Sequence, residues 1–143
     1  MPASAWPTIR HLLLALAVLI SACGDNLPSG RPEGPDASGL WPEERTFHLP
    51  PGVLLEAGLE MRAHDSVDVD YESGGAPVVW DIHIHDGDEI RTEAEGRDES
   101  GAFTFVAPGD GTYWSLWFNE QPASLEVHVS YQGHGSTEFL GWL

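Results

Sequence analysis

The last hundred residues of this sequence predict an all-β protein, a single antiparallel β-sandwich or jelly-roll-like domain. Apolar and polar residues alternate strictly in several short segments, which is typical of strands with one buried face. Glycine- and proline-containing turn sequences separate these segments, and no stretch has a convincing helical period. The length after residue 42 suits one small domain and is too short for two.

The alternating segments follow one another after Glu43. Their apolar positions are Val53, Leu55, Ala57, Leu59, Met61 and Ala63; Val67, Val69 and Tyr71; Trp80, Ile82 and Ile84; and Leu125, Val127, Val129 and Tyr131. Turns are expected between them at Pro51-Gly52, Gly74-Gly75, Asp86-Gly87 and Pro108-Gly109-Asp110-Gly111. We therefore assign residues 43–143 to the β domain.

The N-terminus carries a targeting pattern. Arg10 precedes the apolar run Leu12 to Ile20, and Ser21-Ala22 leads into Cys23, the single cysteine. This order of a charged region, a short apolar region and small residues before a cysteine resembles a bacterial lipoprotein signal. The resemblance implies a signal peptide over residues 1–22 and an acylated Cys23. An ordinary secretion signal is the alternative; a membrane-spanning helix needs about 20 apolar residues, more than this run offers.

Residues 23–42 are rich in proline and glycine, and such a segment buries too little apolar surface to offset its ordering entropy. We interpret it as a disordered tether between the lipidated Cys23 and the β domain, with Leu40 and Trp41 positioned to dock on the domain edge. Gly24, not an aspartate, follows the cysteine. In lipoproteins this favours the outer membrane, if the organism has one, so we expect a lipid-anchored protein of the cell envelope.

The charge is strongly acidic. The chain has 6 arginines, no lysine and 23 acidic residues, for a formal net charge of −17. Removal of the signal peptide takes away Arg10 as well. Such a surface repels nucleic acid and attracts cations or basic proteins, and it also keeps a tethered protein soluble. With Cys23 acylated, neither a disulfide nor cysteine chemistry is available to the domain.

Several consecutive segments in the second half of the domain resemble a known family. Gly101 to Pro108 runs into Asp110-Gly111-Thr112-Tyr113, an aromatic strand ending in Asn119 follows, and a V-x-V strand comes after it. This stretch of sequence is similar to the GOLD domain of emp24-type cargo proteins, over roughly residues 53–131. The resemblance implies a β-sandwich that mediates interactions and a structural corner role for Tyr113. Cargo sorting is not carried over, because the coiled coil and membrane helix of that family are missing.

The segment Asp81-Ile82-His83-Ile84-His85 holds the best candidates for chemistry. Its two imidazoles and one carboxylate share the face opposite Trp80, Ile82 and Ile84. A three-residue loop with Gly87 in the left-handed conformation would pair His83 with Glu89 and Asp81 with Arg91. We reject a two-residue Asp86-Gly87 turn, because it would pair Ile84 with Glu89. His83, His85 and Glu89 then form a ligand set suited to zinc, copper(II) or iron(II).

Two other interpretations of these histidines stay open. They are exposed members of a polar strand face, with Asp81 and Arg91 satisfying each other; or they belong to a degenerate cupin-like enzyme. His83-x-His85 with Glu89 and Gly96 resembles the first cupin motif, but Ser115 occupies the place of the second motif's histidine. His128 is a further candidate whose sheet is undetermined, and we interpret His134 as a mobile loop residue.

The sequence contains no recognised nucleophile or phosphate-loop motif. Trp114 and Trp117 alternate on one strand, so one should lie in the core and the other on the surface, packed under residues 139–142. The acids Asp86, Asp88 and Glu89 do not match a calcium loop. We therefore expect a non-enzymatic binding domain anchored in the envelope, with an envelope protein as partner. Divalent metal binding is the alternative, and no other cofactor is expected.

Overall fold

A computed structural model gives the fold and describes residues 41–143. This part of the chain consists of nine strands and no helix, in agreement with the all-β prediction. The strands are β1 (Glu43–Leu49), β2 (Leu54–Met61), β3 (Ser66–Ser73), β4 (Val78–Asp86), β5 (Glu89–Asp98), β6 (Ser100–Val106), β7 (Gly111–Phe118), β8 (Leu125–His134) and β9 (Glu138–Trp142). No helix suited to crossing a bilayer occurs in residues 41–143.

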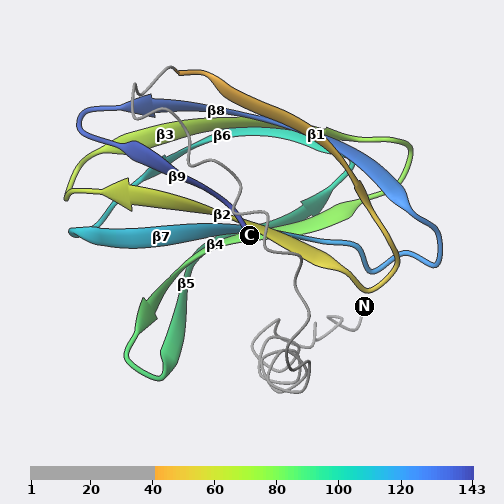
Figure 1. Ribbon diagram of the computed structural model, residues 1–143, viewed down its shortest axis with the longest axis horizontal. Coiled ribbons are helices and arrows are strands. Elements are labelled where there is room, and N and C mark those ends of the chain that lie inside the picture. Colours follow the sequence, from red (N-terminus) through yellow and green to blue (C-terminus); the bar gives the residue numbers. More distant parts are fainter. Residues whose placement is uncertain (1–40) are drawn as a thin grey trace, which may run out of the picture. The chain divides into compact units, whose positions relative to one another are not determined.

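The strands form two antiparallel sheets that pack face to face (Figure 1). One sheet has four strands in the order β1-β8-β3-β6, and the other has five in the order β5-β4-β7-β2-β9. The sandwich prediction is confirmed. Two strands carry little alternation and were not predicted, namely β1 and the C-terminal β9. Both lie at sheet edges.

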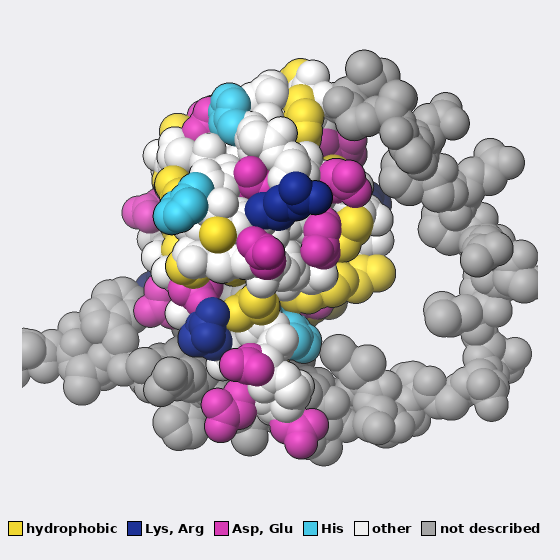
Figure 2. All heavy atoms as spheres, turned by 90° about the vertical axis from the view of Figure 1, so that its left-hand side faces the viewer, with side chains coloured by type: hydrophobic (Ala, Val, Ile, Leu, Met, Phe, Trp, Pro, Cys, Tyr) yellow, Lys and Arg dark blue, Asp and Glu magenta, His cyan; other side chains and the backbone are white. Residues whose placement is uncertain are grey.

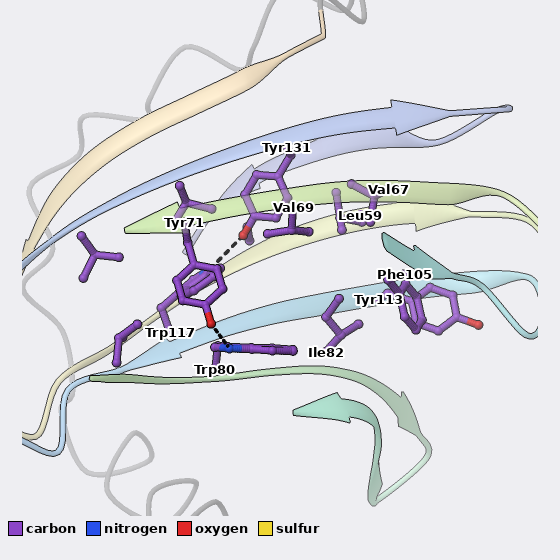
Figure 3. Packing of buried hydrophobic residues seen from close by; sticks show 14 of the residues in the cluster. Leu59, Val67, Val69, Tyr71, Trp80, Ile82, Phe105, Tyr113, Trp117 and Tyr131 are labelled. Carbon is purple, nitrogen blue, oxygen red and sulfur yellow. Dashed lines mark hydrogen bonds between the residues drawn. The ribbon is translucent and has the colours of Figure 1, made fainter. Parts of the chain in front are cut away.

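Aromatic side chains join the two sheets in the core (Figure 3). Trp117 of β7 donates its Nε1–H to the hydroxyl of Tyr131 on β8, at 2.8 Å, and that hydroxyl donates to Ser115 Oγ at 2.9 Å. Trp80 of β4 donates to the Tyr71 hydroxyl of β3 at 2.9 Å. Each of these bonds satisfies a buried polar atom and fixes one sheet against the other.

Two expectations about individual aromatic residues are confirmed. Tyr113 is buried, and its hydroxyl donates to the backbone oxygen of Gly109 at 2.8 Å, as a corner tyrosine does. Trp41 docks on the domain. Its ring packs edge-on against the Phe139 ring, with 6.5 Å between the ring centroids, and it lies close against Gly133. Leu40 and the predicted tether and signal segments lie outside the described residues.

The predicted register of the β4–β5 hairpin is wrong. The turn consists of Gly87 and Asp88, with Gly87 at φ 63°, so that Asp86 pairs with Glu89. His83 therefore lies opposite Thr92, and Asp81 lies opposite Glu95, not Arg91. Arg91 instead bonds Glu93, with Nε and Oε1 2.6 Å apart.

The pairing of β4 with β5 changes register between Ile82 and His83, so the hairpin has one register near its tip and another near its base. The tight turn sets the pairing near the tip. At the other end, the Trp80 ring lies so close over Gly96 that a Cβ there would stand 2.5 Å from it, which sets the pairing of Trp80 with Gly96. The two registers differ by one residue, and a bulge absorbs the difference. Past the bulge the hairpin curves away from the sandwich (Figure 1).

Candidate functional site

Asp81, His83 and His85 lie on the outer face of the five-stranded sheet, on the side of β4 away from the core. We expected all three at the surface. That is correct for His85, whereas the His83 and Asp81 side chains are only 1% and 0% exposed. Two polar groups are thus buried outside the sandwich core, where they require compensating contacts.

Asp81 determines the orientation of the His83 ring. Its Oδ1 lies 2.6 Å from His83 Nδ1, so we assign Nδ1–H as the donor to the carboxylate, which leaves Nε2 to face other groups. That Nε2 faces two further groups: the Nε2 of His85 at 3.2 Å and the Oε1 of Glu56 at 3.6 Å. The arrangement resembles a carboxylate–histidine pair that presents a nitrogen to an electrophile.

The structure replaces one member of the predicted ligand set. Glu89 lies in the hairpin tip opposite Asp86 and is not brought to His83, because the turn, at Gly87 and Asp88, lies further along the chain than we predicted. The acid that approaches His83 is Glu56 of β2. Sequence reasoning missed it because β2 and β4 are neighbours only through β7, and the sheet order cannot be read from alternation alone.

Strand β7 supplies the apolar surroundings of this cluster. Leu116 pairs with Asp81 on one side and with Glu56 on the other, and Trp114 pairs in the same way with His83 and Gly58. Leu116 is buried.

Trp114 is half-buried and lies over Gly58, beside Leu140. The ring centroids of Trp114 and His85 are 6.2 Å apart. Trp117 is the core residue of the pair, and the expectation that the other tryptophan packs against the C-terminal segment is confirmed by the position of Trp114 beside Leu140.

One acceptor of the cluster is left without a partner. Asp81 Oδ2 is buried and has no hydrogen-bond partner, which leaves a carboxylate with part of its acceptor capacity unused. Neither His83 nor His85 has a hydroxyl or thiol among its hydrogen-bond partners in residues 41–143. Within that range no group of three or more His, Cys, Asp or Glu side chains is arranged so that it could hold a metal ion.

The remaining histidines that we considered lie on the other sheet. His128 bonds Thr46, with Oγ1 and Nδ1 3.0 Å apart, on the outer face of the four-stranded sheet. The interpretation of His134 as a loop residue is wrong. It ends β8, and its Nε2 lies 2.8 Å from Asp68 Oδ2. Neither of them joins the β4 cluster.

The outward positions of the four-stranded sheet form a second notable surface, which we call the acidic sheet face. Five acidic side chains lie on it and no arginine does; the acids are Glu44 of β1, Asp68, Asp70 and Glu72 of β3, and Glu126 of β8. Bonds from Thr104 and His134 hold the pKa of Asp68 below its ordinary value. Asp68 therefore remains ionised at neutral pH.

No protein-family model matches the chain, and no curated protein matches it in sequence. Solved structures do resemble it. The PliG periplasmic inhibitor of g-type lysozyme from Aeromonas hydrophila has a TM-score of 0.52 and 10% identity, with 65% of this chain and 86% of that one covered. The Yersinia pseudotuberculosis-derived mitogen has a TM-score of 0.53 and 8% identity, covering 71% and 93%. At these identities the likeness establishes the β-sandwich fold that the chain shares with both.

Proposed function

We propose that this chain is a lipid-anchored binding domain of the cell envelope, whose acidic sheet face binds a cationic protein. The observation that carries this proposal is the composition of that face, where five acids stand among histidines and uncharged residues without any arginine. A surface that carries charge of one sign on a rigid sheet attracts a partner of opposite charge and orients it during encounter.

The positive charges of the domain do not offset the negative charge of the acidic sheet face. Residues 41–143 contain four arginines and twenty acidic residues. Arg91 and Arg97 already form ion pairs with Glu93 and Glu120, and the Arg45 guanidinium lies 5.2 Å from the centre of the Trp142 ring. Figure 2 shows one side of the domain, on which acidic side chains outnumber basic ones. The excess of negative charge is therefore available to a partner.

The architecture suits presentation of such a face. β3 carries three of the five acids and lies between β8 and β6, so its backbone is hydrogen-bonded on both sides. A partner that binds there does not have to order a loop first, which lowers the entropic cost of association. The PliG inhibitor, which has a similar fold, is a protein that acts on another protein. Its target, g-type lysozyme, is accordingly the first candidate partner to test.

The proposed anchor rests on the sequence. Cys23 and the segment around it lie outside the described residues, and the order Arg10, Leu12 to Ile20 and Ser21-Ala22-Cys23 supports acylation. A tethered domain benefits from a high local concentration of envelope partners, so weak electrostatic binding is sufficient.

Binding to g-type lysozyme and to a cationic model protein such as cytochrome c tests the proposal. Association rates should fall steeply between about 20 and about 300 mM salt, because the Debye length shrinks from about 20 to about 6 Å. An Asp70→Asn, Glu72→Gln double variant should associate several-fold more slowly than the wild type. An Asp88→Asn, Glu89→Gln variant changes the net charge equally at the hairpin tip and should have a smaller effect. Binding to neither protein at low salt, or equal effects of both variants, would contradict the proposal.

A further inference from the structure

The cluster on the outer face of β4 supports an inference that does not depend on the proposed partner. We propose that His83, His85 and Glu56 bind a divalent first-row transition metal ion, with Asp81 orienting His83 from behind. This set differs from the one that the sequence predicts, since Glu56 takes the place of Glu89.

The distance between the two imidazoles is the first argument. Two ligands that share a zinc or copper ion at about 2.0–2.1 Å, with a near-tetrahedral angle, stand roughly 3.3 Å apart. His83 Nε2 and His85 Nε2 are 3.2 Å apart. Because Asp81 accepts the Nδ1–H of His83, the His83 Nε2 offers a lone pair to an ion between the rings.

Charge is the second argument. Glu56 Oε1 lies 3.6 Å from His83 Nε2, and Asp81 is a fully buried carboxylate with one oxygen unbonded. Two acids therefore flank the two imidazoles beside the buried Leu116 and the half-buried Trp114. Positive charge at Nε2 would stabilise both carboxylates, and surroundings of low dielectric strengthen this attraction. A divalent cation supplies that charge.

Access is the third argument. His85 is exposed and the Glu56 side chain is 25% exposed, so one side of the cluster reaches solvent although His83 does not. As the side chains stand, these three donors are not arranged to hold a metal ion, so binding requires the Glu56 side chain to turn toward the two rings. Solvent would occupy the remaining coordination positions. Imidazole and carboxylate donors favour Cu²⁺ over Zn²⁺, and Zn²⁺ over Mn²⁺.

Titration of the metal-free chain with Cu²⁺ alone and Zn²⁺ alone tests the site. We expect one ion per chain by calorimetry, with Cu²⁺ bound more tightly, and a rise in melting temperature that grows with metal concentration. His85→Gln and Glu56→Gln should each weaken binding about tenfold or more. The Asp81→Asn substitution keeps the shape of the side chain but removes its charge, and it should weaken metal binding by about 10–100-fold.

Two matched controls distinguish the site from general attraction of cations to an acidic protein. Glu89→Gln removes the acid that the sequence predicted, and His134→Gln removes a histidine that bonds Asp68 on the other sheet. Both should bind metal like the wild type. Because His85 is exposed, its variant should fold normally, and an unchanged metal-free melting temperature would confirm this. Equal affinity in wild type and His85→Gln, or an equal loss in His134→Gln, would overturn the proposal.

Discussion

The hydroxyl of Tyr131 accepts a hydrogen bond from Trp117 and donates one to Ser115, and in this way it links the four-stranded sheet to the five-stranded sheet. All three residues are buried, so no solvent replaces a lost bond. Burial also raises the pKa of the Tyr131 hydroxyl far above its ordinary value, so the group stays neutral and remains a donor throughout the physiological range.

Tyr131→Phe should lower the free energy of unfolding by about 1–3 kcal/mol, because it leaves the buried Trp117 Nε1–H without an acceptor. Tyr71→Phe provides a comparison. The Tyr71 hydroxyl accepts one bond, from Trp80, and is less deeply buried, so the loss should be smaller. Urea unfolding of both variants measures the difference. A larger loss in Tyr71→Phe would show that the Tyr131 hydroxyl is not the more important of the two links between the sheets.

Gly96→Ala should destabilise the domain by about 1–3 kcal/mol through overpacking. A Cβ at residue 96 would stand 2.5 Å from the Trp80 ring, which is held by its bond to Tyr71 and by stacking on Phe103 at 4.2 Å. Gly109→Ala is the matched control, since no atom lies within 4 Å of a Cβ built there. Thermal melts should show a clear loss for Gly96→Ala and little change for Gly109→Ala.

The stability contributed by Asp65 should depend on pH. Its carboxylate accepts bonds from the Ser136 hydroxyl at 2.7 Å and from the backbone nitrogens of Arg62 and Ser136, and these bonds lower its pKa below the ordinary 3.8. A group whose pKa is lower in the folded state stabilises the fold above its unfolded pKa, and this contribution is lost as pH falls through the folded value.

Asp65→Asn should therefore be less stable than the wild type at pH 7, and the gap should narrow at about pH 2–3. Urea unfolding at both pH values measures the gap. If it is the same at both, the carboxylate charge of Asp65 does not contribute to stability.

Mass spectrometry of the native N-terminus should find Cys23 as the first residue, carrying acyl chains. Cys23→Ala should prevent this modification and release the protein from the membrane fraction, because multiple buried acyl chains supply the stable attachment. Fractionation of cells that express both forms provides the second measurement. An intact Met1, or an unmodified Cys23, would argue against the anchor.

Alternation predicted the sandwich because the strands that carry it are half-buried. Val67, Val69 and Tyr71 of β3, for example, all face the core as expected. It did not predict the β4–β5 register, because that depends on how Trp80 packs over Gly96, a contact between distant positions. It also did not identify Glu56 as a neighbour of His83, since this requires the order β4-β7-β2. The alternation therefore predicted the half-buried strands, but neither the register of the β4–β5 hairpin nor the order of strands in the sheet.

The bulge between Ile82 and His83 divides the β4–β5 hairpin into a part fixed by the core and a tip fixed by its own turn. Gly87 and Asp88 are exposed, and no atom lies within 4 Å of a Cβ built at Gly87. A short peptide epitope inserted between these two residues should consequently leave the sandwich intact, since exposed loop tips accept insertions readily. Antibody labelling of whole cells that carry such an insertion would then reveal on which side of the membrane the domain is displayed.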